Sequence, residues 1–319
     1  MNYCSMGIND YLSGIKQGDR SILAKAITLI ESSLEGDKKT ASDLIEQCTS
    51  ISKKSIRIGI SGTPGVGKST FIEALGILLT KKKYKIAVLA IDPSSIISQG
   101  SILGDKTRME KLSNSEKAFI RPSPNKGVLG GVSNNTRDAI ILCEAAGYDI
   151  IIVETVGVGQ SETLVKSMTD VFIYLTLVEN GDELQFMKKG IMELSDIVII
   201  NKSDQNPKKV KEMKVILEHY IKSHNTNNKK HIFTCSATNN INIKNVWKNI
   251  ERFYLDKIKS GELDNIRNTQ NIFWLKKVIE QEYMNLLYKN KKLEKKILEF
   301  EKKPIKNVRK IALDIIQQL

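Results

Sequence analysis

One short stretch, residues 56–70, constrains the fold of this chain more than any other. It reads Ile-Arg-Ile-Gly-Ile-Ser-Gly-Thr-Pro-Gly-Val-Gly-Lys-Ser-Thr, which places a glycine-rich turn between a β-branched run and a helical pattern. Strand, glycine-rich turn and helix in this order form the context of a phosphate-binding loop, or P-loop. The glycines let backbone N–H groups converge on phosphate oxygens. The stretch therefore predicts a nucleotide site.

The loop also supplies two side chains with defined chemistry. Lys68 can reach the β- and γ-phosphates, and the Ser69 hydroxyl is a hard oxygen ligand for Mg²⁺. The helix that follows adds partial positive charge at its N-terminus. The predicted phosphate contacts are Gly62, Thr63, Pro64, Gly65, Val66, Gly67, Lys68, Ser69 and Thr70.

Strand and helix signals alternate over residues 54–255. Near-continuous β-branched runs such as Ile150–Val153 are typical of strands buried on both faces. We predict an open, mostly parallel α/β sheet with helices on both faces and the ligand at the carboxyl ends of the strands. The predicted strands are Ile56–Ile60, Ile86–Ile91, Ala118–Ile120, Asp149–Glu154, Val171–Val178, Asp196–Ile200 and His231–Thr234, and the predicted helices include Ser133–Ala146, Glu183–Leu194 and Pro207–Lys222.

Helical patterns flank this core at both ends. Residues 1–53 are expected to form a helical extension, with one helix opening at Ser42. After Asp256 strand signals stop, and apolar residues recur every seven positions from Ile272 to Phe300, which predicts one long amphipathic helix or two. This seam either packs on its own domain or pairs two subunits. We expect residues 256–319 to form a dimerisation arm.

Composition narrows the class of protein. No run of apolar residues is long enough to span a membrane, and the N-terminus has no targeting pattern, so we expect a cytoplasmic protein that binds no membrane. The net charge of +13 could indicate nucleic acid, yet no aromatic residues are interleaved with the basic ones. Solvated helix faces, such as the lysine-rich segment from Lys289 to Lys310, are the favoured interpretation.

The tetrapeptide from Asn201 to Asp204, Asn-Lys-Ser-Asp, follows a predicted strand. A carboxylate at Asp204 can accept hydrogen bonds from the N1–H and 2-amino groups of guanine, and adenine offers no such pair of donors. Cys235-Ser-Ala, at the end of the next strand, fits the same site. We therefore predict that the nucleotide is GTP or GDP. The predicted guanine contacts are Asn201, Lys202, Asp204, Ser236 and Ala237.

Two acidic residues end neighbouring predicted strands, Asp92 and Glu154. Carboxylates beside a P-loop suit direct or water-mediated binding of Mg²⁺. The segment from Glu154 to Gly157 resembles the one that senses the γ-phosphate in GTPases, where Gly157 would donate its backbone N–H. Gln160, three residues further on, is a candidate for positioning the attacking water.

Further motifs carry a resemblance to a known family. They are Asp92-Pro-Ser-Ser, Gly104-Asp-Lys-Thr-Arg-Met109, Arg121-Pro-Ser-Pro, Gly130-Gly-Val, Glu144-Ala-Ala-Gly-Tyr-Asp149, Glu154-Thr-Val-Gly-Val-Gly-Gln-Ser-Glu162 and Gly181-Asp-Glu-Leu-Gln185. In this order they resemble the methylmalonyl-CoA mutase-associated GTPases, the MeaB/ArgK family. The resemblance covers nearly the whole core and the helical prefix.

The resemblance implies a P-loop protein of the signal-recognition-particle/MinD class that forms a homodimer. It implies that GTP hydrolysis is coupled to loading or protection of the adenosylcobalamin cofactor of a methylmalonyl-CoA mutase-like enzyme. By position, Asp105 falls in a loop that approaches Mg²⁺, and Lys188 falls in a switch segment that communicates with the mutase. The candidate catalytic residues are Lys68, Asp105, Glu154, Gln160 and Lys188, and the candidate Mg²⁺ ligands are Ser69, Asp92, Asp105 and Glu154.

Two other functions fit a P-loop protein of this kind. One is a kinase or ATPase associated with lysine, arginine or ornithine transport, and the guanine-reading Asp204 argues against it. The other is a nickel-insertion GTPase, which usually carries histidine-rich or cysteine-based metal sites. The histidines and cysteines of this chain have no metal-ligand spacing, which argues against that function.

Overall fold

The computed structural model describes residues 6–32, 34–92, 109–124, 129–155, 161–178, 190–224, 231–301 and 307–317. The chain forms two compact units, Met1–Asn268 and Thr269–Leu319, and each is described by itself. The larger unit contains the sheet and all described residues of the predicted nucleotide site.

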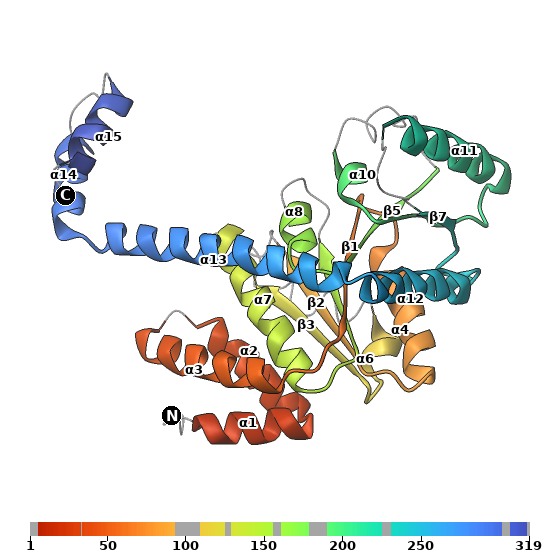
Figure 1. Ribbon diagram of the computed structural model, residues 1–319, viewed down its shortest axis with the longest axis horizontal. Coiled ribbons are helices and arrows are strands. Elements are labelled where there is room, and N and C mark those ends of the chain that lie inside the picture. The colour runs from red at the N-terminus through yellow and green to blue at the C-terminus, as the bar shows by residue number, and fades with distance from the viewer. Residues whose placement is uncertain are drawn as a thin grey trace. The chain divides into compact units, whose positions relative to one another are not determined.

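The predicted parallel α/β sheet is confirmed. Seven strands lie in the order β3-β2-β4-β1-β5-β6-β7, and each neighbouring pair is parallel (Figure 1). Their bounds are β1 (Ile56–Gly62), β2 (Ile86–Asp92), β3 (Ala118–Pro124), β4 (Ile150–Thr155), β5 (Val171–Thr176), β6 (Ile197–Ile200) and β7 (His231–Thr234). Because all strands run the same way, their carboxyl ends meet at one edge of the sheet.

Helices cover both faces of the sheet. One face carries α4 (Lys68–Lys81), α6 (Glu110–Ser113) and α12 (Ile243–Lys259). The other carries α7 (Leu129–Ala145), α8 (Ser161–Lys166), α10 (Ile191–Leu194) and α11 (Pro207–His224). Alternation along β1 explains this division: Ile58 and Ile60 join the core of the first face, while Gly59 lies against Val165 of α8.

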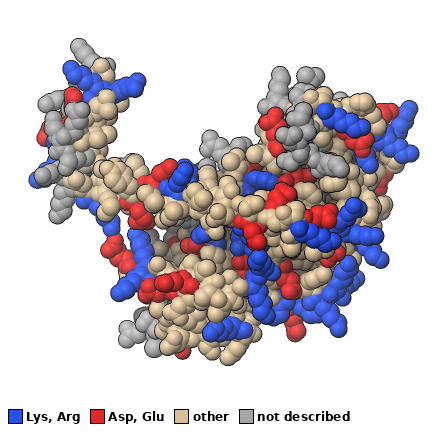
Figure 2. Space-filling view, in the orientation of Figure 1, with Lys and Arg blue, Asp and Glu red and all other residues tan. Residues whose placement is uncertain are grey.

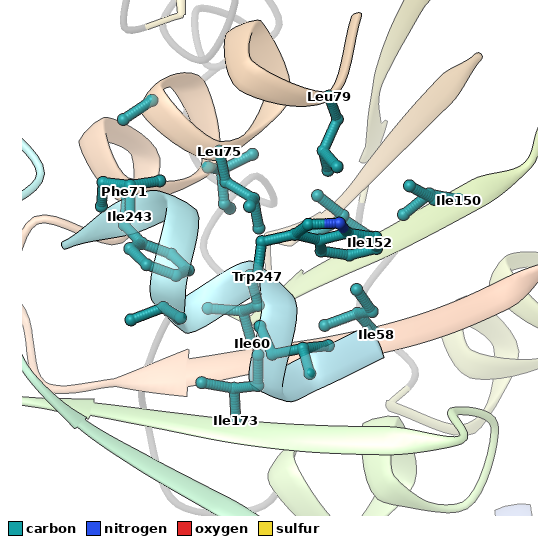
Figure 3. Close-up of a cluster of buried hydrophobic side chains, with 14 of the residues drawn as sticks. Ile58, Ile60, Phe71, Leu75, Leu79, Ile150, Ile152, Ile173, Ile243 and Trp247 are labelled. Atoms are coloured by element: carbon teal, nitrogen blue, oxygen red, sulfur yellow. The ribbon is translucent and has the colours of Figure 1, made fainter. Parts of the chain in front are cut away.

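Trp247 of α12 is the largest fully buried side chain and lies at the centre of the first core. Figure 3 shows it between Leu75 and Leu79 of α4 and the isoleucines of β1 and β4. Truncating a buried tryptophan to alanine costs about 3–5 kcal/mol in general. This packing holds α4, which begins at the P-loop lysine, in a fixed place over β1.

The N-terminal extension consists of α1 (Ile8–Gln17), α2 (Arg20–Ile30) and α3 (Glu35–Ile51), which pack on one another and on α7. The expectation that a helix opens at Ser42 is wrong, since α3 begins at Glu35. Glu35 and Asp37 place acidic side chains in its first turn, which stabilises a helix start. Arg121 of β3 ties α2 to the sheet edge through an ion pair of 2.6 Å with Glu31.

The C-terminal helices are α13 (Glu262–Tyr288), α14 (Lys291–Glu301) and α15 (Val308–Gln317). The sequence left open whether the heptad pattern forms one helix or two, and the pattern falls on both α13 and α14. Within the described residues, no helix has the length and apolar character that crossing a membrane requires.

A buried ionic network lies at the opposite edge of the sheet from the P-loop. Arg267 donates from Nε to Asp170 Oδ1 at 2.9 Å and from Nη2 to Asp170 Oδ2 at 2.8 Å. The backbone N–H of Arg57 donates to the same carboxylate, and Lys257 Nζ donates to the Asp170 carbonyl oxygen. The Arg57 guanidinium in turn forms two 2.8 Å hydrogen bonds to Glu144. These bonds fix the base of α13 to the amino ends of β1 and β5.

We expect Arg267→Met to lower the free energy of unfolding by about 3 kcal/mol, because it leaves the fully buried Asp170 carboxylate without its bidentate partner. Urea denaturation followed by fluorescence measures this change. Arg252→Met is the matched control, since its ion pair with Asp256 is exposed and spans 3.8 Å. The control should change stability by less than about 1 kcal/mol. If the two substitutions lowered the free energy of unfolding equally, the buried ion pair of Arg267 with Asp170 would not stabilise the fold as we expect.

Candidate functional site: a P-loop joined to a guanine-binding loop

The P-loop has the geometry that its sequence predicts. β1 ends at Gly62, the loop turns through a hydrogen bond from Val66 N–H to Thr63 O, and α4 begins at Lys68. Gly67 has φ +88°, a conformation that other residues adopt only with strain. Lys68 Nζ donates to Gly62 O at 2.7 Å, which places the ammonium within the loop. The arrangement can bind a phosphate group with backbone N–H groups and one cation.

Ser69 and Glu154 meet beside this loop. Ser69 Oγ donates to Glu154 Oε1 at 3.2 Å, and Glu154 is buried at the end of β4. β2 runs next to β4 and ends at Asp92, so the backbone of Asp92 lies at the same edge. The Asp92 side chain lies outside the described residues. A hydroxyl and a carboxylate oxygen are donors that Mg²⁺ prefers, so this pair fits a magnesium site.

Asn201 joins the guanine-reading segment to the P-loop. Its Nδ2 donates to Val66 O at 2.9 Å, and its Oδ1 accepts from Ala237 N–H at 3.0 Å. The Cys235 thiol donates to the same Oδ1 at 3.5 Å, and burial raises the pKa of this thiol to about 12. The three predicted segments are therefore one connected unit, with Asn201 only 2% exposed at its centre.

Asp204 remains exposed at the rim of the same unit. Hydrogen bonds from Ser236 first, and from Asn239 also, hold the pKa of its carboxyl group below the usual value, so it is ionised at neutral pH. Asn239 Nδ2 donates to Asp204 Oδ2 at 2.8 Å. Sequence reasoning missed Asn239, whose only signal was its position three residues after Ser236. Lys202, between Asn201 and Asp204, adopts φ 53°, which turns the chain sharply there.

Four predicted site residues lie outside the described residues: Asp105, Gly157, Gln160 and Lys188. Their roles stay predictions, as do the roles of the other predicted site residues. The other predicted contacts, from the P-loop and from the two guanine segments, all lie at the carboxyl edge of the sheet.

The face drawn in Figure 2 carries side chains of both charges. Acidic side chains lie among the lysines and arginines over most of that face. This mixture favours the interpretation of the +13 net charge as solvated helix faces.

Comparisons with known proteins agree with this geometry. A family model described as methylmalonyl Co-A mutase-associated GTPase MeaB matches residues 23–292. GTPase ArgK of Escherichia coli (strain K12) is 44% identical over 280 residues, which are 86% of this chain and 85% of that protein. The mitochondrial methylmalonic aciduria type A homolog of Mus musculus is 40% identical over 283 residues, covering 84% of this chain and 68% of that protein. A crystal structure of a LAO/AO transport system kinase has a TM-score of 0.75 at 34% identity and covers 100% of this chain and 98% of that one.

We expect Asp204→Asn to weaken GTP binding about 100-fold and to strengthen binding of xanthosine triphosphate, because the amide donates where the carboxylate accepted. Calorimetry with both nucleotides measures the exchange. Asp256→Asn, which alters an exposed carboxylate on α12, serves as the control and should change neither affinity. A variant that still prefers GTP would show that Asp204 does not read the base.

Proposed function

The chain belongs to the methylmalonyl-CoA mutase-associated GTPases, and on this premise we propose that it is a GTP-driven chaperone of an adenosylcobalamin-dependent acyl-CoA mutase. It is a P-loop GTPase. The observation that carries the proposal is the connection of P-loop and guanine reader through Asn201, together with a family match that extends from α2 into α14. GTP binding and hydrolysis would be coupled to loading or protecting the mutase cofactor.

In this proposal the residues around the loop bind and orient GTP. The loop N–H groups and Lys68 hold the β- and γ-phosphates, while Asp204 and the Ala237 segment hold the guanine. Ser69 and Glu154 would hold Mg²⁺ directly or through water, with Asp92 and Asp105 as further candidate ligands. When bound, Mg²⁺ neutralises the charge on the β- and γ-phosphate oxygens.

The switch residues complete the proposal. Gly157 and Gln160 follow β4 in sequence, and Lys188 follows β5, so each comes after a strand that ends at the nucleotide edge. We assign Gly157 to the γ-phosphate, Gln160 to the attacking water and Lys188 to a cation that acts when the partner is bound. A site that a partner completes would have slow intrinsic turnover.

The alternative function is a kinase or ATPase associated with amino-acid transport. It matches the description of one solved relative, a LAO/AO transport system kinase. An ATP-dependent enzyme has no use for a carboxylate that reads the N1–H and 2-amino groups of guanine. The exposed Asp204 carboxylate, which is available to accept both donors of guanine, therefore favours GTP.

We also propose a homodimer formed through α13. Ile272, Ile279 and Leu286 repeat at heptad spacing, and their side chains are 49%, 59% and 68% exposed. At this spacing the apolar side chains form one stripe along the helix, and a second copy of the seam can cover that stripe. The buried free thiols of Cys48, Cys143 and Cys235 fit a reducing compartment, which supports the cytoplasm.

We expect a purified adenosylcobalamin-dependent methylmalonyl-CoA mutase to raise GTP turnover at least about tenfold, because a partner supplies or orders the groups that complete the site. Turnover is measured at saturating GTP with and without the mutase. Lys188→Ala should lose most of this stimulation.

Lys68→Ala is the control for that experiment, since it removes the phosphate partner and should abolish turnover with or without the mutase. Unchanged turnover of the wild type in the presence of mutase would contradict the chaperone function. Equal stimulation of Lys188→Ala and wild type would contradict only the role of Lys188.

We expect the double variant Ile279→Glu with Leu286→Glu to be a monomer, because it places charges in the middle of the apolar seam. Light scattering at micromolar concentration measures the mass. Lys276→Ala, an exposed position on the same helix, should remain dimeric. A wild-type protein that is itself monomeric would refute the dimer.

A further inference from the structure

A buried network of hydrogen bonds lies beside the P-loop. None of its three side chains is among the nucleotide contacts described above. Thr155 Oγ1 donates to Ser61 Oγ at 2.9 Å, and Ser61 Oγ donates to Glu162 Oε1 at 3.4 Å. Thr155 and Ser61 are 0% exposed and Glu162 is 2% exposed. Thr155 therefore supports Ser61, and Ser61 donates to a carboxylate that is buried from solvent.

Each of the three side chains in this network belongs to a different part of the site. Ser61 directly precedes Gly62, the first glycine of the P-loop. Thr155 directly follows Glu154, which accepts the hydroxyl of Ser69. Glu162 lies in the first turn of α8, which packs on β1, β4 and β5. The three side chains thus connect the loop, the end of β4 and α8.

Burying the Glu162 carboxylate at this position costs free energy. Its Oε2 is buried and has no hydrogen-bond partner among the residues that the structure describes. The carboxylate lies close enough to Tyr174 that, after burial itself, its charge helps to raise the pKa of the tyrosine hydroxyl. One neutral hydroxyl is a weak partner for a buried carboxylate, and a well-packed apolar side chain would cost less there. Stability alone does not explain this residue.

We propose that Glu162 is a positioning residue for GTP hydrolysis. It accepts the hydrogen bond of Ser61 and so holds α8 against the ends of β1 and β4, which keeps Glu154 in place beside Ser69. It does not touch the nucleotide. Small displacements of groups around a reacting centre lower rates strongly, so its loss acts on the rate of the chemical step and spares ground-state binding.

The competing explanation is purely structural. An acidic side chain in the first turn of a helix stabilises that helix, and Glu162 occupies such a position in α8. That role predicts a lower unfolding midpoint for any substitution of Glu162. It predicts no change in the hydrolysis rate of the molecules that remain folded.

The test compares Glu162→Ala and Glu162→Gln in the full-length protein. Single-turnover hydrolysis of GTP gives the rate constant, and calorimetry gives the affinity for GDP. We expect Glu162→Ala to hydrolyse GTP at least about tenfold more slowly, with its GDP affinity within about twofold of wild type. Glu162→Gln keeps a side-chain carbonyl oxygen that accepts from Ser61, so it should recover most of the rate.

Glu144→Gln is the matched control. Glu144 is also a buried glutamate, 3% exposed, but it accepts from Ser55 and Arg57 at the amino ends of the strands. This variant should lower the unfolding midpoint and leave the hydrolysis rate unchanged, whereas Glu162→Ala should lower the hydrolysis rate.

Ser61→Ala tests the connection itself. If Glu162 acts through Ser61, the double variant Ser61→Ala with Glu162→Ala is no slower than Glu162→Ala alone, because both substitutions break the same hydrogen bond between Ser61 and Glu162. Ser61→Ala also carries the test if Glu162→Ala does not fold. An unchanged rate in Ser61→Ala, independent losses in the double variant, or a Glu162→Gln variant as slow as Glu162→Ala would each overturn the proposal.

Discussion

β1 is buried on both faces and paired along both edges, and the rest of the structure depends on this strand. It pairs with β4 on one side and β5 on the other, and the contacts across these strands leave no room for a side chain at two positions. A Cβ at Gly59 would lie 2.7 Å from the Phe172 ring, and one at Gly62 would lie 2.5 Å from Leu175 O. Because the neighbours are parallel, the P-loop opens at the edge where they too end. The nucleotide site follows from that confinement.

Asn201 explains why this edge works as one site. Its amide forms hydrogen bonds both to the P-loop and to the Ala237 segment, so the loop and the proposed guanine-binding segment are held together. Gly67 is part of the same arrangement, since a Cβ there would lie 2.9 Å from Asn201 Nδ2. The glycines of the loop thus have two effects. They let the backbone approach phosphate, and Gly67 leaves space for the Asn201 amide that holds the proposed guanine-binding segment.

Patterns local in sequence predicted the strands and the P-loop, because burial on both faces demands β-branched runs and tight turns demand glycine. The start of α3 was misjudged because Ser42 resembles a helix cap, while the buried Leu44 and Cys48 belong to a longer helix. The pairs formed by Arg267 with Asp170 and by Asn239 with Asp204 join distant segments. The spacing of residues in the sequence predicts neither such contacts nor the order of the strands in the sheet.

The two edges of the sheet have opposite polar chemistry. At the amino ends, Asp170 and Glu144 each accept two hydrogen bonds from a guanidinium, which are among the strongest that side chains form. At the carboxyl ends, Glu154 and Glu162 accept from serine hydroxyls, and the hydroxyl of Ser69 can rotate towards a cation when one binds beside the P-loop. The guanidinium pairs at the amino edge therefore stabilise the fold, and this stability allows the carboxyl edge to keep buried carboxylates beside weaker, neutral hydroxyl donors.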